Sequence, residues 1–462
     1  MPLQMGPVAF AFSRYTKRRG RSFGEVQTVF SRSPADHPTF AIIRSWNNWT
    51  QASVIRTLET LGENYPVYLM CCQTFGSEGN CGDVFHTAIQ GFHGPGKLEV
   101  VCAKTTVAVL YTIKQKLDEK DIDTVKVIAP AQRKPLMREY VNQLFTSVYQ
   151  FEFKDFQMNC EENNLRKSAE LQGELMPLTD QDREKIQTEI TIFLKSLPSL
   201  KGELTILKSS LIPDPIFLHG FTTRMGGISY IPTLSSFNLF SSSKRRDPPI
   251  VVKENLRRLA AAAGFNPDAY HRVKVNHASD VWVMGKAEPD NYDGIVTNQK
   301  GVTLAAPGAD CIPVLFADPV KKACGAAHSG WQGTLLGVSM AVINAMVTEY
   351  GCDVKDILVV LGPSVGPCCF KLPRESAKSF LRIDPKCVRL YESSTPYVDL
   401  RRATRILLET GGVLPQNIQD DSVTDQNQNV TVCTSCCPDK FYSHVRDGEN
   451  FGTQIGFISI RD

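Results

Sequence analysis

The segment ADCIPVLFADPVKKACGAAHSGW, residues 309–331, contains a cysteine and a histidine on either side of a turn. Cys311 opens one apolar run, His328 closes the next, and the DPVK sequence at 318–321 is typical of a type I turn. In an antiparallel hairpin closed by that turn, Cys311 and His328 would face each other with Cβ atoms about 4.5–5.5 Å apart. That separation leaves room for one metal ion, bound at ~2.3 Å by sulfur and ~2.0 Å by nitrogen.

The metal interpretation has a structural alternative, which is a buried thiol beside a core histidine, and this stretch alone favours neither. A third ligand would decide between them, and the chain offers few candidates because it has 8 histidines. The candidates in suitable contexts are His277 in KVNHASDVW, His219 in FLHGFTT and His444 in FYSHVRD. Two histidines and one cysteine would leave the fourth position of a tetrahedral metal open, as a catalytic site requires.

Other polar segments suggest loops around one cleft. Arg224 precedes a glycine pair in TTRMGG and could bind phosphate, although a surface salt bridge is the simpler interpretation. Asn238 lies in a polar segment, and the KRR sequence at 244–246 that follows is interpreted as a solvated loop. GWQGT at 330–334 leads into a helix expected at 334–350, whose N-terminus could hold an anion.

The 14 cysteines are scattered along the chain, and the N-terminal segment is a poor secretory signal, so the thiols are expected to be reduced. The cysteines at 368–369 and 433–437 could form a second zinc site, but ordinary buried thiols are the favoured interpretation. The net charge of +3 gives no reason to expect nucleic acid as a partner. No apolar run approaches the ~18 residues of a membrane span.

The elements that must position these residues fall into three parts. Residues 1–36 are expected to be a disordered tail, and residues 37–178 alternate strand and helix patterns, which indicates a smaller α/β domain with parallel strands. Its GxxxxGK sequence at 91–97 precedes a strand rather than a helix, so we interpret it as a turn. A capped amphipathic helix at 179–198 opens the larger domain, 179–462, which is expected to be α+β with a mixed or antiparallel sheet and flanking helices.

Six segments in fixed order resemble the laccase-domain family, also called multicopper polyphenol oxidoreductases: HGFTTRMGGIS, KVNHASDVW, GADCIPVLFAD, AAHSGWQGT, LGPSVGPCC and FYSHVRDG. The resemblance covers about residues 200–462, and with the region before it the whole chain resembles vertebrate members. Despite the family's name, the resemblance implies a zinc-dependent purine nucleoside enzyme. It implies phosphorolysis of adenosine, inosine and methylthioadenosine, and deamination of adenosine. The family's metal ligands correspond to His277, Cys311 and His328, and its arginine corresponds to Arg224.

Several positions depart from the family's pattern, among them the segment DGENFGTQIG, which lacks the arginine of many bacterial members. Ser329 and Gln332 stand where the family usually has alanine and a basic residue, which could weaken phosphorolysis. In the expected mechanism a zinc-bound water of lowered pKa deaminates adenosine. Phosphate attacks the ribose instead in phosphorolysis. The expected phosphate and substrate contacts are Arg224, the backbone from Gly330 to Gly333, His219 and Asn238, with Asp310 as a possible proton shuttle.

Two alternatives come from other classes of protein. A scaffold would use residues 37–178 to bind a metabolic enzyme or an organelle surface and retain a weakly active domain. A copper phenol oxidase is disfavoured because the chain has no His-x-His pair. The resemblance implies a cytoplasmic protein of purine metabolism with a role in immunity and the inflammatory response. A nuclear location and association with organelles such as peroxisomes or the endoplasmic reticulum could add to the cytoplasmic one.

Overall fold

The computed structural model describes residues 39–41, 66–72, 98–129, 131–155, 178–420, 423–425, 428–430 and 433–462. Residues Pro38–Asp462 form one compact unit. The expected tail at 1–36 and the GxxxxGK sequence before Leu98 lie outside the described residues. Among the described residues, no helix combines the length and apolar character needed to cross a membrane.

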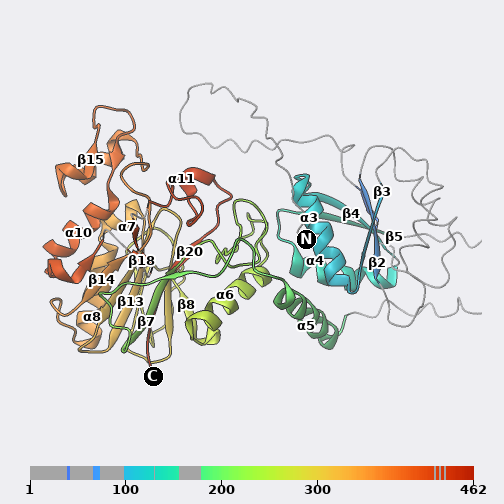
Figure 1. Ribbon diagram of the computed structural model, residues 1–462, viewed down its shortest axis with the longest axis horizontal. Coiled ribbons are helices and arrows are strands. Elements are labelled where there is room, and N and C mark those ends of the chain that lie inside the picture. The colour runs from blue at the N-terminus through green and yellow to red at the C-terminus, as the bar shows by residue number, and fades with distance from the viewer. Residues whose placement is uncertain are drawn as a thin grey trace, which may run out of the picture. The chain divides into compact units, whose positions relative to one another are not determined.

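The first sheet is parallel throughout, in the order β3-β2-β1-β4-β5. Helices α3 and α4 follow β3 and β4 and lie against the sheet (Figure 1). Their apolar residues share one core with the strands. The expected α/β layer with parallel strands is therefore confirmed. The bounds are β1 Thr39–Ala41, β2 Val67–Cys72, β3 Leu98–Ala103, α3 Thr106–Glu119, β4 Thr124–Ala129, α4 Lys134–Leu144 and β5 Gln150–Asp155.

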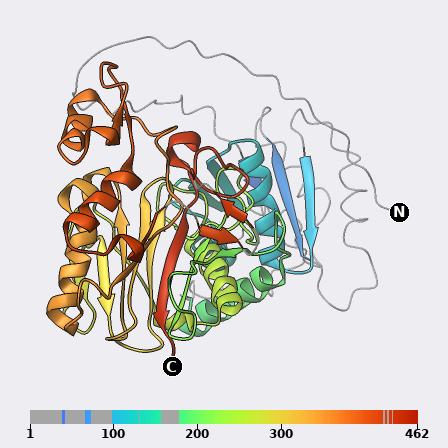
Figure 2. The same ribbon diagram turned by 60° about the vertical axis from the view of Figure 1, so that its left-hand side comes forward.

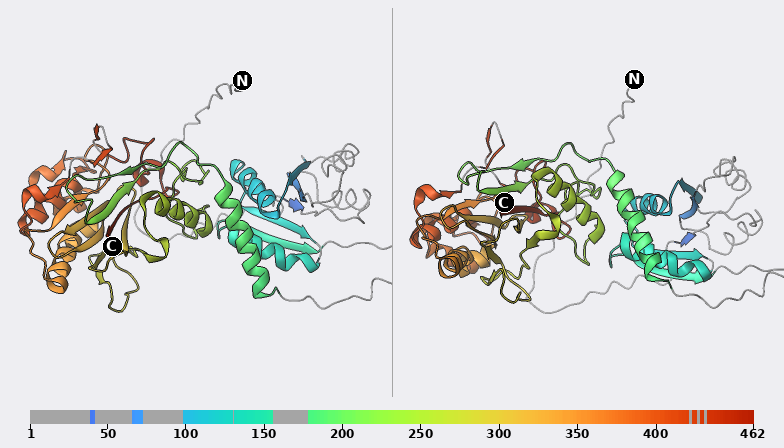
Figure 3. Two further views of the ribbon diagram at one scale, coloured as in Figure 1. Left: turned by 60° about the horizontal axis from the view of Figure 1, so that its bottom comes forward. Right: turned by 90° about the horizontal axis from the view of Figure 1, so that it is seen from below.

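Helix α5, Asp180–Ser196, begins where the sequence predicts. Thr179 caps it, because its hydroxyl accepts from the backbone N–H of Asp182 while the Asp182 carboxylate accepts from the backbone N–H of Thr179. Its buried residues, Ile186, Ile190 and Leu194, recur every four positions and form one face of the helix. Helix α5 packs against α3 and α4 and against α6, Pro249–Ala263 (Figure 3). The domain boundary at residue 179 stays a prediction.

Residues from 206 onward build two mixed sheets that pack face to face (Figure 2). One sheet has the order β17-β14-β12-β13-β10-β9 and the other β6-β7-β20-β11-β8, and both combine parallel and antiparallel pairs. The expected mixed sheet is confirmed. The strands are β6 Ile206–Leu207, β7 Phe217–Thr222, β8 Tyr270–Arg272, β9 Val281–Val283, β10 Gly294–Thr297, β11 Thr303–Gly308, β12 Ile312–Asp318, β13 Ala323–Ser329, β14 Leu358–Leu361, β17 Ile418–Gln419 and β20 Gln454–Ile460.

Helices cover the outer face of the six-stranded sheet, where their apolar residues form a second core. They are α7 Trp331–Leu336, α8 Val338–Tyr350, α9 Arg374–Leu381 and α10 Leu400–Thr410. The remaining elements are short: β15 Val388–Arg389, β16 Tyr397–Val398, β18 Val423–Asp425, β19 Gln428–Val430 and α11 His444–Asp447.

The single helix expected at 334–350 is two helices. The first, α7, begins three residues earlier than expected, at Trp331. Gly337, with a φ of +80°, separates it from the second, α8. Glycine adopts this left-handed conformation at no steric cost, so the chain changes direction there. The expected end at Gly351 is confirmed, since Gly351 caps α8 in the left-handed region.

The predicted register of the hairpin that carries Cys311 and His328 is wrong by two residues. β12 and β13 pair Asp318 with Ala323, so the loop holds four residues, and His328 lies opposite Pro313 rather than Cys311. The Asp318 carboxylate accepts hydrogen bonds from the backbone N–H groups of Val320 and Lys321, at 2.8 and 2.9 Å, and these bonds widen the turn. A slip of two residues keeps every side chain on its original face, so Cys311 stays near His328.

The backbone conformation of Lys322 in this loop leads to a testable prediction about strain. Lys322 has a φ of +51°, whereas its equally exposed neighbour Lys321 does not lie in the left-handed region. Replacing Lys322 with glycine relieves this strain, worth ~1 kcal/mol, and replacing Lys321 does not. Urea unfolding should therefore find Lys321→Gly less stable than Lys322→Gly by about 1 kcal/mol. Equal stabilities would contradict the four-residue turn.

Candidate active site

Three potential metal ligands meet at one end of the six-stranded sheet. The ligand atoms of His277, Cys311 and His328 all lie within 4.8 Å of one another. His328 is buried in β13, Cys311 immediately precedes β12, and His277 lies in the exposed loop between β8 and β9 with a φ of +62°. The structure thus brings together the three residues that the sequence singled out.

Asp293, immediately before β10, holds two of these ligands in place. Its fully buried carboxylate accepts a hydrogen bond of 2.8 Å from His328 Nδ1. It also accepts the backbone N–H groups of Asn276, His277 and Ala278 at 2.9–3.2 Å. The contact at His328 Nδ1 leaves Nε2 as the nitrogen available to a metal.

The electrostatics of the cluster favour a cation. Burial acts to raise the pKa of Asp293, but the His328 hydrogen bond and the backbone N–H groups outweigh it and lower that pKa. Burial acts to lower the pKa of His328, but the Cys311 sulfur and Asp293 raise it to about 9. A proton on His328 and a metal ion therefore compete for the same anionic surroundings.

Two glycines allow the loop of His277 to approach the hairpin. A Cβ atom at Gly330 would lie 3.1 Å from both Cys311 Sγ and His277 Nδ1. A Cβ atom at Gly333 would lie 3.1 Å from the Ala278 carbonyl oxygen. The donor set of two imidazoles and one thiolate, kept free of side chains by Gly330, fits a tetrahedral zinc ion with one open position.

The cluster forms one wall of a pocket of about 610 Å³. This volume suits a small organic ligand, and aromatic and aliphatic side chains form most of the remaining lining. The lining residues are Phe240, Arg245, Val275, His277, Pro307, Gly308, Ala309, Asp310, Cys311, His328, Trp331, Gln332, Val365, Phe370, Leu372, Leu400, His444, Val445, Phe451 and Thr453.

Arg245 contributes a buried cation to this pocket. Its guanidinium lies between the rings of Phe240 and Phe451, at 4.7 and 4.2 Å from their centroids. Among the described residues it donates one side-chain hydrogen bond, to Thr453 Oγ1 at 3.0 Å. Burial lowers its pKa to about 10, so it remains charged at neutral pH. The sequence prediction of a solvated loop was wrong here, because flanking aromatic rings bury the arginine.

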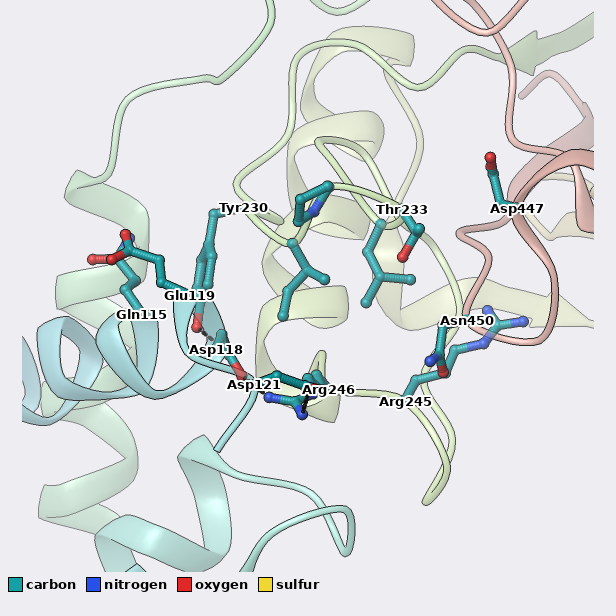
Figure 4. A pocket seen from close by; sticks show the side chains of 13 residues that line it. Gln115, Asp118, Glu119, Asp121, Tyr230, Thr233, Arg245, Arg246, Asp447 and Asn450 are labelled. Carbon is teal, nitrogen blue, oxygen red and sulfur yellow. Dashed lines mark hydrogen bonds and ion pairs between the residues drawn. The ribbon is translucent and has the colours of Figure 1, made fainter. Parts of the chain in front are cut away.

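Arg246, the next residue, links this loop to the first sheet's helices. Its guanidinium binds Asp118 at 2.7 Å and Asp121 at 2.6 Å. Figure 4 shows these side chains in a second pocket of about 640 Å³, which Arg245 also lines. Asp118 accepts further hydrogen bonds from Tyr149, Tyr230 and Lys114. Helix α3 therefore helps to fix the loop that carries Arg245.

Five residues expected at the site lie outside the pocket's lining: Arg224, His219, Asn238, Gly330 and Gly333. Gly330 nevertheless lies against the ligand atoms of Cys311 and His277. Arg224 donates to the backbone carbonyls of Ser235, Pro438 and Pro232 at 2.8–2.9 Å, so these groups occupy the guanidinium expected to bind phosphate. His219 is fully buried, with Nε2 at 3.1 Å from the backbone N and O of Ser209.

Asn238 acts on the pocket indirectly. Its side-chain oxygen accepts the backbone N–H groups of Phe240 and Thr453, both of which line the pocket. Asp310 does line the pocket, but each of its carboxylate oxygens accepts a hydrogen bond of 2.6 Å, from Thr434 Oγ1 and from the Val445 N–H. His444, the third candidate ligand from the sequence, also lines the pocket and packs on Phe451.

Asp293 and Arg245 are the residues that sequence reasoning missed. An aspartate directly before the apolar strand GIVT is a usable signal, because a carboxylate at that place needs hydrogen-bond donors. Arg245 gave no comparable signal, since its burial depends on Phe451, which is distant in sequence.

Two mixed sheets position a His₂Cys cluster beside a cavity, an arrangement that fits a metal-binding enzyme domain. Comparison with known proteins identifies the family of this domain. Residues 218–461 match the family described as multi-copper polyphenol oxidoreductase laccase, and the chain belongs to this family. The expected family resemblance is confirmed.

The match to a human relative extends beyond this domain, whereas two bacterial relatives match about half of the chain. Purine nucleoside phosphorylase LACC1 of Homo sapiens is 60% identical over 398 residues, which cover 85% of this chain and 90% of that protein. A purine nucleoside phosphorylase of Deinococcus radiodurans is 36% identical over 250 residues, 54% of this chain and 91% of that protein. The solved structure of YlmD from Geobacillus stearothermophilus, 28% identical, aligns with a TM-score of 0.49 over 56% of this chain and 96% of its own.

The role of Asp293 can be tested by metal binding. Asp293→Asn should weaken zinc affinity about 10- to 100-fold, because the amide no longer provides a carboxylate partner for His328. Competition with a chromophoric chelator measures the affinity. Asp290→Asn, a change of the same kind at an exposed position three residues away, should leave it unchanged. Equal affinities in the two variants would contradict this role.

Proposed function

We propose that this chain is a zinc-dependent purine nucleoside phosphorylase that converts adenosine, inosine and methylthioadenosine to free base and the corresponding ribose 1-phosphate. The observation that carries the proposal is the presence of the His277, Cys311 and His328 cluster and buried Arg245 in one pocket. The names of the human and Deinococcus relatives support it. We further propose that the same site deaminates adenosine to inosine.

In this proposal the aromatic lining receives the purine. Phe240, Trp331, Phe370 and Phe451 line the pocket, and aromatic side chains suit a flat heteroaromatic base. Arg245 binds phosphate, because its remaining N–H groups can donate charge-assisted hydrogen bonds, and the low dielectric of the buried site strengthens their attraction to an anion. Gln332, which also lines the pocket, adds a neutral donor where the family pattern has a basic residue.

The reaction then follows from these positions. A phosphate oxygen forms a bond to C1′ of the ribose, the bond from C1′ to the base breaks, and the departing base takes up a proton. A zinc ion held by His277, Cys311 and His328 would supply Lewis-acid chemistry and lower the pKa of a bound water. Asp310 acts as a positioning residue in this scheme, since both carboxylate oxygens already accept hydrogen bonds.

The broader expectations also stay proposals. We propose a cytoplasmic protein, with residues 37–178 as the part that binds a metabolic enzyme. The scaffold and copper phenol oxidase alternatives give different outcomes in the experiment that follows.

Product analysis tests the function. Purified zinc-loaded protein is incubated with adenosine and phosphate, and products are identified by mass spectrometry. The proposal expects adenine and ribose 1-phosphate, with inosine as a second product, and no product from Cys311→Ala. Absence of any product from the zinc-loaded chain would contradict the proposal and favour the scaffold. Oxygen uptake with phenols by copper-loaded protein would favour the oxidase.

Arg245 gives a sharper prediction. Arg245→Gln should raise the KM for phosphate about 10- to 100-fold, because it removes a charged hydrogen bond worth ~1.5–3 kcal/mol. The KM for the nucleoside should change much less. Lys244→Gln removes the neighbouring exposed charge and serves as the matched control. A phosphate KM that responds equally to both substitutions would mean that Arg245 does not bind phosphate.

A further inference from the structure

Four cysteines outside the proposed active site converge on one point. The Sγ atoms of Cys368, Cys369, Cys433 and Cys436 all lie within 4.8 Å of one another. Cys436 Sγ is 3.5 Å from Cys368 Sγ and 3.4 Å from Cys369 Sγ. The two pairs come from segments more than 60 positions apart in the sequence, so tertiary structure and not local spacing brings them together.

These distances suit one tetrahedral ion. Four ligands at about 2.3 Å from zinc are separated from one another by roughly 3.8 Å, which is close to the spacings between these sulfur atoms. A disulfide would need about 2.05 Å, and all four cysteines are free thiols. Thiolate sulfur is a soft ligand that selects zinc over the hard cations calcium and magnesium.

Gly366 allows the backbone to lie close to the four sulfur atoms. The Gly366 N–H donates to Cys433 Sγ at 3.3 Å, as backbone amides do to metal-bound thiolates. A Cβ atom at Gly366 would lie 3.2 Å from Cys368 Sγ and 3.3 Å from Cys433 Cβ, so glycine permits this close approach. Cys437, by contrast, packs against the core between the two sheets and is not among the four converging thiols.

We propose that Cys368, Cys369, Cys433 and Cys436 bind a second zinc ion in a closed structural site. Four protein ligands leave no open position for water or substrate, which distinguishes this site from the His₂Cys cluster. The two sites share no residue. The sequence had favoured ordinary buried thiols here, and Cys368 and Cys436 are in fact exposed.

This second ion would stabilise the two loops that contact Asp310 in the wall of the active-site pocket. The two loops that it joins are already linked by a hydrogen bond of 3.0 Å from Thr434 N to Ser364 O. Both loops also hold Asp310, the neighbour of Cys311: Val365 N donates to its carbonyl at 3.0 Å and Thr434 Oγ1 to its carboxylate. A metal that fixes the loops therefore fixes the backbone beside a ligand of the first site.

Metal counting tests the proposal on the full chain, purified without chelators. Plasma mass spectrometry should find two zinc ions per chain. Cys311→Ala and Cys436→Ser should each lose one of the two, and the double variant should lose both. Cys437→Ser, a change at the adjacent cysteine, should keep both. One zinc per chain that survives Cys436→Ser and is lost in Cys311→Ala would overturn the second site without touching the proposed function.

Two measurements avoid dependence on a variant that fails to fold. X-ray absorption at the zinc edge of the unmodified chain should give an average of about 2.5 sulfur ligands per zinc, against one for the His₂Cys site alone. Alkylation before and after reduction counts the thiols in the same sample. A single sulfur per zinc, or a disulfide within the cluster, would overturn the proposal.

Discussion

The hydrogen bond between Asp293 and His328 is the interaction on which the site depends. One buried carboxylate binds the imidazole of a core strand and three consecutive amides of an exposed loop. An unpaired carboxylate buried at this position would cost several kcal/mol, so the loop amides and the imidazole are needed to keep it charged. The same contacts place His277 against Cys311 and His328. The ligand cluster is thus a consequence of satisfying one buried charge.

A second buried charge, on Arg245, connects the pocket to the rest of the chain. Two aromatic rings cover its guanidinium, and its neighbour Arg246 is fixed by Asp118 on helix α3. Because Asp118 also accepts from two tyrosines and a lysine, the contact is part of a network rather than an isolated surface pair. Helix α3 of the first sheet therefore contributes to the position of a pocket residue, which gives residues 98–155 a structural link to the site.

The sequence predicted much of this arrangement for identifiable reasons. Alternating apolar strands and capped helices specify the parallel sheet and α5 locally, and a cysteine and histidine on one hairpin stay on one face even when the register moves by two. The register itself depended on how Asp318 bonds to the loop, which residue types alone do not decide. Arg224, expected to bind phosphate, is instead hydrogen-bonded to backbone carbonyls, and Arg245, expected in a solvated loop, is buried at the pocket. Both outcomes depend on partners distant in sequence.

Anomalous diffraction from crystals of the zinc-loaded chain, collected on both sides of the zinc and copper edges, decides whether His277, Cys311 and His328 bind zinc. A peak at the zinc edge is expected between these three residues, with no protein atom at the fourth coordination position. His328 Nε2 is expected to be the coordinating nitrogen. A peak that appears at the copper edge instead, or no peak among these three residues, would contradict zinc binding by this cluster.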